Sequence, residues 1–221
     1  DTGNDEIHAQ LQSWVVDING MKVLIDTGAG NHKERPGIPL FGQLETPFIE
    51  RLAAAGFAPE DIDMVICTHL HVDHVGWNTM LVDGKWVPTF PKARYLIGKR
   101  EWDFWSTEDD EDNAPVLADS VQPIFDAGLA DLVSDDHVVC DEVRLRPTPG
   151  HTPGHVSIVI SSKGETAIIT GDLMHHPCQM AKTDWRSAFD SDGDMDIRFP
   201  GFCRHGLFGM NIRRWLPSSD V

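Results

Sequence analysis

The sequence has few basic residues for its length. Its 221 residues include 18 Lys and Arg against 35 Asp and Glu, which gives a formal net charge of −17. A chain with this charge repels phosphate backbones and anionic lipid, and no cluster of basic residues offsets that repulsion. We therefore expect no nucleic-acid partner and no association with a membrane.

Paired cysteines and long apolar runs are also missing. No apolar run approaches the roughly 20 residues that a membrane-spanning helix needs, and the first ten residues lack the regions of a signal peptide. These absences predict a soluble, cytoplasmic protein, and the first residue, Asp1 rather than Met, is compatible with a trimmed start. A chain this long does not need disulfides, and none of its cysteines forms a CxxC pair, so reduced thiols are expected at Cys67, Cys140, Cys178 and Cys203.

The pattern of strands and helices lacks internal repeats and a uniform βαβ alternation, which argues against a doubly wound nucleotide-binding fold. Asn19-Gly20 between two β-rich runs predicts a hairpin. Apolar faces predict helices over residues 47–55, 99–105 and 115–128. Further strand signals lie at residues 64–68, 93–98, 137–140, 142–148, 155–161 and 165–172. This order favours two mixed β-sheets packed face to face with helices outside, in one domain over residues 1–221 with an atypical tail at 182–221.

The densest group of potential metal ligands lies in the segment THLHVDHVGWNT, residues 68–79. In an extended strand end, residues two apart point the same way, so His69 and His71 can converge on one point. Asp73 and His74, on the turn that follows, can face a second point nearby. Two imidazoles and one more nitrogen or oxygen donor suit a catalytic zinc ion, which keeps one position for water.

Two further candidate ligands follow at the ends of later strands. His151 lies in PTPGHTPGH and Asp172 in IITGDL, and the two oxygens of a carboxylate can bridge two cations about 3.5–4 Å apart. A lone histidine is usually solvent-facing or hydrogen-bonded. HxHxDH spacing followed by a strand-end His and a strand-end Asp is hard to explain in that way, so the pattern predicts a metal site.

Together, the segments LIDTGAG, HLHVDH, PTPGHTPGH and TGD resemble the metallo-β-lactamase-fold hydrolases, over about residues 14–179. The resemblance implies a four-layer αββα sandwich with the site at one edge of the paired sheets, and two Zn²⁺ or other divalent ions. It implies that Asp26 orients a ligand histidine. The implied metal ligands are His69, His71 and His151 for the first ion, Asp73 and His74 for the second, and Asp172 as the bridge between them.

The sequence departs from the family near the C-terminus. The family completes its second metal site with a histidine on a late strand, and no such strand is evident here. His205, in FCRHGLFG, is a candidate for this ligand, with a surface or packing histidine as the alternative. The acidic run that begins at Asp190 lacks the Gly and Glu of a calcium loop, so we expect a solvated loop there.

Candidate pocket residues lie close to the predicted ligands. His175 and His176 follow Asp172 too closely to match the family's late histidine, but either could line the pocket. Trp77 and Met174 could give it an apolar wall, with core packing as an equal alternative.

Three branches of the family are excluded as poor matches to this sequence. His74 and the bridging Asp172 look unlike class B β-lactamases, the net charge disfavours nucleases, and the residues after 181 are too few for the helical domain of glyoxalase II. The remaining resemblance is to the branch of acyl-homoserine lactonases and methyl-parathion-hydrolase-like enzymes.

The expected reaction is hydrolysis without a covalent intermediate, because zinc lowers the pKa of bound water from 15.7 to about 7. Asp73 and Asp172 are the expected catalytic carboxylates. The expected substrates are small lactones or carboxylic esters, with organophosphate triesters or β-lactams as side substrates. The alternative is a metal-binding protein with an incomplete second site and little catalysis, acting in interaction or sequestration. A homodimer is left open.

Overall fold

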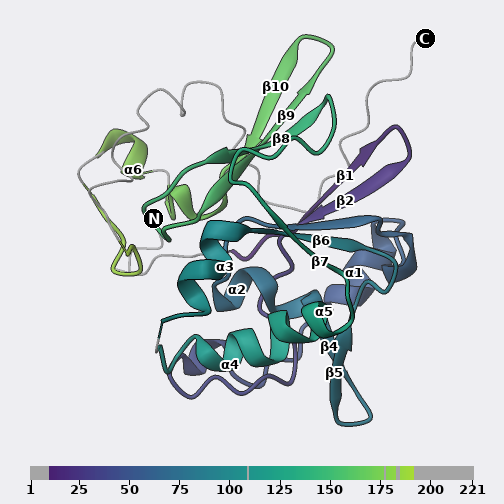
Figure 1. The fold of residues 1–221 in the computed structure, drawn as a ribbon, viewed down its shortest axis with the longest axis vertical. Helices are drawn as coiled ribbons and strands as arrows, with labels where there is room; N and C mark the ends of the chain where they lie inside the picture. The colour runs from purple at the N-terminus through teal and green to yellow at the C-terminus, as the bar shows by residue number, and fades with distance from the viewer. Residues whose placement is uncertain (1–9, 109, 177, 183–184, 192–221) are drawn as a thin grey trace, which may run out of the picture.

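The computed structural model describes residues 10–108, 110–176, 178–182 and 185–191 (Figure 1). Its larger sheet has five strands in the order β1-β2-β3-β6-β7. β1 and β2 are antiparallel, whereas β2, β3, β6 and β7 run parallel to one another. The strands are β1 (Trp14–Ile18), β2 (Met21–Ile25), β3 (Met64–Cys67), β6 (Arg94–Gly98) and β7 (Ala130–Val133).

The smaller sheet is antiparallel, with the strand order β10-β9-β8. It consists of β8 (Val143–Pro147), β9 (Val156–Ser162) and β10 (Glu165–Ile169). A separate hairpin of β4 (Thr79–Val82) and β5 (Lys85–Pro88) projects from the opposite end of the molecule (Figure 1).

Short helices cover one face of the larger sheet (Figure 1). They are α1 (Phe48–Ala54), α2 (Val72–Val75), α3 (Lys99–Trp105), α4 (Ala114–Val116) and α5 (Gln122–Asp126), with a π-helical segment (Leu117–Val121) between the last two. Single 3₁₀ turns lie at Pro39–Phe41, Pro59–Asp61, Gly76–Asn78 and Gly171–Leu173, and α6 (Cys178–Ala181) follows the last of them. No helix within the described residues has the length and apolar content that a membrane crossing requires.

Two hydrophobic cores separate these layers. Because successive residues of a strand point to opposite faces, Leu24 of β2 packs toward the helices, whereas Val23 and Ile25 face the smaller sheet. The second core joins Ile66 of β3 to Ile158 of β9. The predicted α+β class, with two sheets packed face to face and helices outside, is therefore confirmed.

Local predictions from the sequence hold in part. Asn19 and Gly20 both have positive φ angles, as the predicted hairpin turn requires. The strand expected at residues 137–140 is wrong, because only an isolated bridge from Val138 to Arg144 forms there. Most of the predicted tail lies outside the described residues.

A buried ion pair ties the loop after β2 to the helical layer. Asp119, on the π-helical segment, accepts hydrogen bonds from both terminal nitrogens of Arg35, at 2.7 and 2.8 Å. The ammonium of Lys33 lies 3.3 Å from the same carboxylate and 3.7 Å from the ring centre of Trp86.

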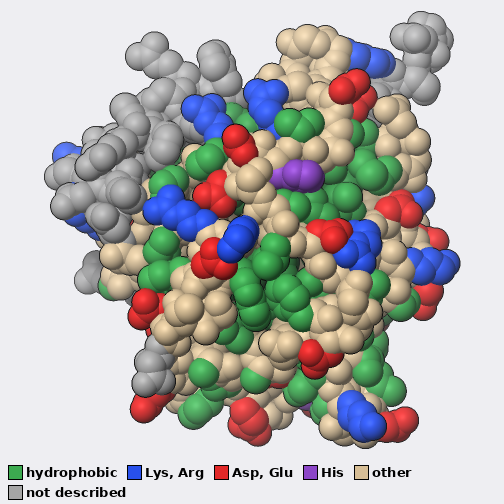
Figure 2. All heavy atoms as spheres, in the orientation of Figure 1, with side chains coloured by type: hydrophobic (Ala, Val, Ile, Leu, Met, Phe, Trp, Pro, Cys, Tyr) green, Lys and Arg blue, Asp and Glu red, His purple; other side chains and the backbone are tan. Residues whose placement is uncertain are grey.

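On the face shown in Figure 2, acidic and basic side chains are interspersed, so the negative charge does not gather there in one patch.

The two sheets bring four loop segments to one edge. These segments follow β2, β3, β8 and β10, and they carry Asp26, His69–His74, His151 and Asp172. The amide of Asp26 donates to the carbonyl of Ile66, and the amide of Val156 donates to the carbonyl of Thr68, both at 3.0 Å. The backbone itself therefore joins the loops of both sheets at the edge where the resemblance places a metal site.

Gly76 provides a test of how tightly these loops pack. A Cβ atom at Gly76 would lie 1.9 Å from the carbonyl carbon of Ala29, in backbone that cannot move aside cheaply. We expect Gly76→Ala to lower the free energy of unfolding by about 2–4 kcal/mol. Gly84→Ala, which has a positive φ but open space around it, should cost about 1–2 kcal/mol. Urea denaturation measures both, and equal losses would contradict the packing argument.

Candidate metal site

Asp26 lies at the base of the site and is 3% exposed. Its Oδ2 accepts a hydrogen bond from Nδ1 of His74 at 2.9 Å. The amide of Thr68 donates to Oδ1 at 2.8 Å, and the Thr68 hydroxyl donates to Oδ2 at 2.8 Å. One carboxylate therefore receives donors from two neighbouring parts of the segment after β3.

These contacts fix the proton on His69 as well. The single hydroxyl proton of Thr68 is donated to Asp26, so the Thr68 oxygen accepts at its lone pair from Nδ1 of His69, 3.1 Å away. The Nε2 of His69 then carries a lone pair, and this buried atom has no hydrogen-bond partner. Burial, followed by the nearby His74 and His71, holds the pKa of His69 well below its ordinary value. The neutral ring with a free lone pair is the form that binds a metal.

Three imidazoles converge on the free nitrogen of His69. One donor atom from each of His69, His71 and His151 lies within 4.8 Å of the others. The Nδ1 of His71 and the Nε2 of His151 are 2.8 Å apart. Two nitrogens bound to one tetrahedral zinc ion would lie about 3.3 Å apart. The donor set and its spacing therefore fit a shared ion.

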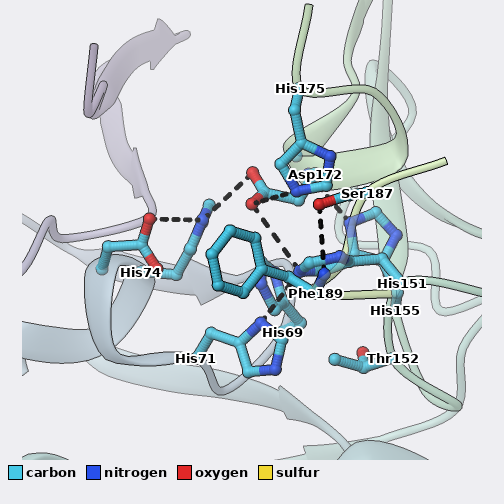
Figure 3. A network of polar contacts seen from close by, with 12 residues as sticks. His69, His71, His74, His151, Thr152, His155, Asp172, His175, Ser187 and Phe189 are labelled. Atoms are coloured by element: carbon cyan, nitrogen blue, oxygen red, sulfur yellow. Dashed lines mark hydrogen bonds and ion pairs between the residues drawn. The ribbon is translucent and has the colours of Figure 1, made fainter. Parts of the chain in front are cut away.

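Asp172 faces histidines with both of its oxygens (Figure 3). Its Oδ1 lies 3.1 Å from Nε2 of His74, and its Oδ2 lies 3.6 Å from Nε2 of His151. The Nε2 of His175 is 3.3 Å from the same Oδ2. This geometry places His69, His74 and Asp172 in a second group of potential ligands, and His151, Asp172 and His175 in a third.

The two sides of the site hold opposite charges. Burial raises the pKa of Asp172, but His74 and His175 outweigh it and hold that pKa well below its ordinary value. Burial likewise opposes a charge on His74, yet Asp172, Asp73 and Asp26 hold its pKa well above its ordinary value. Metal binding through Nε2 of His74 would therefore release a proton.

Asp73 lies at the margin of the cluster. Its Oδ2 is 3.7 Å from Nε2 of His74, and burial raises its pKa. Among the described residues it belongs to none of the three potential ligand groups. Its role as a ligand of a second ion stays a prediction, as does that of His205, which lies outside the described residues.

The expected pocket residues differ in their surroundings. Trp77 is 8% exposed and stacks on Phe48, with ring centres 5.3 Å apart. His176 is exposed, and its Nδ1 accepts from the amide of Cys178. Met174 is half-buried. His175 contacts a predicted ligand, because its Nε2 forms an ion pair with Asp172, and the pocket itself stays a prediction.

His155 supports Asp172 and was missed by the sequence analysis. It is 1% exposed, and its Nε2 accepts from the amide of Asp172 at 3.1 Å. Its Nδ1 lies 3.1 Å from the carbonyl of Thr148, so the proton is on Nδ1. Burial, with a contribution from His151, lowers the pKa of His155 to about 3. The second Gly-His of PTPGHTPGH is the only sequence signal that could have pointed to it.

Asp190, the first residue of the expected solvated loop, has a buried side chain, and the loop from residue 192 onward lies outside the described residues. Its side chain is 4% exposed, and Oδ1 lies 3.0 Å from Nδ1 of His151. The amide of Ser191 also donates to the carbonyl of His151. The carboxylate thus places the proton of His151 on Nδ1 and leaves Nε2 for the cluster. No pattern in the sequence distinguishes Asp190 from its acidic neighbours, because its partner lies 39 residues away.

Comparisons with known proteins match the chain to a family model and to a lactonase relative. A family model described as the metallo-beta-lactamase superfamily matches residues 10–197. An N-acyl homoserine lactonase of a Bacillus species is 28% identical over 165 residues, which cover 69% of this chain and 59% of that protein. The chain thus spans about three fifths of the length of this relative.

Two solved structures are similar in sequence and in fold. The hydrolase AbOPH is 27% identical with a TM-score of 0.65, and the match covers 82% of this chain and 62% of AbOPH. AidC, a dizinc quorum-quenching lactonase in complex with the product N-hexnoyl-L-homoserine, is 26% identical with a TM-score of 0.64. That match covers 81% of this chain and 62% of AidC.

Asp26→Asn tests the base of the site. An amide cannot accept from both Thr68 and His74 at the positions of the two carboxylate oxygens, so the rings lose their fixed orientation. We expect zinc affinity to fall about 10- to 100-fold. Competition with a chromogenic chelator measures the affinity, and Asp17→Asn, near the end of β1, is the control. Unchanged affinity in Asp26→Asn would contradict the assigned proton positions.

His155 predicts a pH dependence of stability in chelator-treated protein. In the unfolded chain, His155 takes up a proton near pH 6.5. In the native protein, His155 takes up this proton only near pH 3. Because the unfolded state binds more protons in this window, stability falls as the pH falls below 6.5. Between pH 7 and 5 we expect the wild type to lose about 2 kcal/mol more than His155→Gln. Urea denaturation at both pH values measures this difference, and parallel losses would contradict a buried neutral His155.

Proposed function

The chain belongs to the metallo-beta-lactamase superfamily, and we propose that it is a metal-dependent hydrolase that opens lactones or cleaves carboxylic esters. The observation that carries the proposal is the buried, unpaired Nε2 of His69, on a ring grouped with three further histidines and a carboxylate. A buried polar atom without a partner is costly unless a ligand satisfies it. A metal ion satisfies it and explains why so many imidazoles lie together.

The residues divide into two roles at this site. The rings of His69, His71 and His151 would hold one cation, and His74 with Asp172 would hold a second at the adjoining group. When bound, a divalent ion of the zinc type supplies a Lewis acid and lowers the pKa of a water molecule to about 7. Asp26 and Asp190 keep ring protons on Nδ1 and away from the cluster.

Asp172 and its neighbours can accept and transfer protons during hydrolysis. Its carboxylate faces His74 and His151, where it can orient a water molecule held near Oδ1 or Oδ2 and accept its proton. His175 reaches the same Oδ2 from an exposed position, so it can pass a proton between the site and solvent. Asp73, beside His74, would help to orient the water nucleophile.

Lactones and neutral esters are the substrate class that the comparisons support. The Bacillus relative and AidC are both lactonases, and each shares about a quarter of its aligned residues with this chain. A chain with a net charge of −17 also favours a neutral substrate over a phosphate-rich one.

A metal-binding protein with little catalysis is the second candidate. It is favoured by one observation: Asp73, the expected ligand of the second ion, joins none of the potential ligand groups among the described residues. Under this alternative the first group of histidines still binds metal, but a lactone is not turned over.

Metal removal and Asp172→Ala separate the two candidates. We expect chelation to abolish turnover of an N-acyl homoserine lactone and added zinc to restore it. We expect Asp172→Ala to lower kcat/KM by about 100-fold or more, because the variant loses a ligand and a proton acceptor. Glu165→Ala, at an exposed position of β10, is the matched control. Metal analysis that shows bound zinc in a wild type without turnover of lactones or esters would favour the second candidate.

A further inference from the structure

A buried glutamate of α3 lies between the two loops that carry the first group of ligands. Glu101 is 1% exposed and belongs to the first turn of the helix. Three of its hydrogen-bond partners come from the segment after β3 and from the segment after β8, 31 and 51 to 53 residues away in the sequence. None of the motifs that predicted the metal site contains this residue.

Each oxygen of the Glu101 carboxylate accepts two hydrogen bonds. Oε1 accepts from the amide of Leu70 at 3.0 Å and from the indole nitrogen of Trp105 at 2.7 Å. Oε2 accepts from the hydroxyl of Thr152 at 2.7 Å and from the amide of Gly154 at 3.0 Å. Burial raises the pKa of Glu101, whereas these four donors lower it. A proton on either oxygen would face a donor, so the geometry suits the carboxylate.

The loop groups that Glu101 holds lie close to the candidate ligands in the sequence. Leu70 separates His69 from His71, Thr152 follows His151 directly, and Gly154 lies three residues after His151. The turn after β8 also packs too closely against α3 to admit a side chain at Gly154, because a Cβ atom there would lie 2.2 Å from the backbone nitrogen of Glu101. The carboxylate thus sets the distance between the pair of histidines on one loop and the single histidine on the other.

We infer that Glu101 is a positioning residue that joins the two ligand loops and thereby sets the affinity of the His69, His71 and His151 group for metal. The inference rests on the proposed metal site. Replacing a side chain that hydrogen-bonds to the surroundings of the metal ligands, without binding the metal itself, typically changes metal affinity 10- to 100-fold. Glu101 acts on all three ligands through the backbone, whereas Asp26 and Asp190 each act on ring protons.

Glu101→Gln keeps the shape of the side chain and gives a specific result. Leu70 and Trp105 can only donate, so the amide oxygen remains on their side. The new amide nitrogen then faces Thr152, whose hydroxyl can rotate to accept, and Gly154, whose amide cannot. We expect hydrogen exchange at the Gly154 amide to accelerate at least tenfold in metal-free protein, with little change at Leu70.

Zinc competition against a chromogenic chelator provides the second measurement. We expect Glu101→Gln to bind zinc about 10- to 100-fold more weakly than the wild type. Thr152→Val, which removes one donor and keeps the shape, should weaken binding to a smaller extent and remains informative if Glu101→Gln does not fold. Leu52→Ala, in the core between the larger sheet and the helices, is the control for lost stability and should leave zinc affinity unchanged.

The outcomes separate this inference from the proposed function. Weakened zinc binding in both site variants but not in Leu52→Ala, together with faster exchange at Gly154, supports the role of Glu101. Wild-type affinity in folded Glu101→Gln and Thr152→Val, or an equal loss in Leu52→Ala, overturns it while the proposed function stands. A wild type that binds no zinc ends the proposed function, and unchanged exchange at Gly154 then also overturns the link between the loops.

Discussion

The hydrogen bonds that the Asp26 carboxylate accepts determine the chemistry of the whole site. Histidines packed this closely could exchange protons and hydrogen-bond to one another, which would consume the lone pairs that a metal needs. Asp26 prevents this for two of them, because it accepts from His74 directly and from His69 through the hydroxyl of Thr68. The left-handed backbone of Asp26, with a φ of 54°, is part of what turns its side chain toward them.

The protein environment favours different protonation states in two histidines that are only a few ångströms apart, a neutral ring at His69 and a charged ring at His74. His69 and His74 have ring centres 4.0 Å apart, yet the pKa of the first lies well below its ordinary value and that of the second well above it. Burial is the largest cause for both rings, and the difference comes from the three carboxylates around His74. Such a divergence between neighbouring groups is typical of sites that bind or transfer charge.

The fold supports this arrangement by bringing loops from both sheets to one edge. Buried carboxylates then join loops that the strands only place near each other: Asp26 joins the turn after β2 to the segment after β3, and Glu101 joins that segment to the turn after β8. The carboxylates that connect loops are nearly inaccessible to solvent, whereas Asp172, at the centre of the cluster, is partly exposed. The residues that connect the loops are thus different from the residue proposed to take part in hydrolysis.

The sequence by itself determined the fold class and the main candidates for the site. Strand periodicity, the Asn19-Gly20 turn and the HxHxDH spacing are local signals, and the order of strand-end ligands restricted the topology. Asp190 and Glu101 could not be recognised in that way, because their functional partners lie on other elements and their own neighbourhoods in the sequence carry no signal. His155 has the second Gly-His of PTPGHTPGH as its only signal, and its partner Asp172 also lies on another element. Only the tertiary structure decided which carboxylates would be buried against ring nitrogens and loop amides, since burial and hydrogen bonding depend on what packs against a residue rather than on what precedes it in the chain.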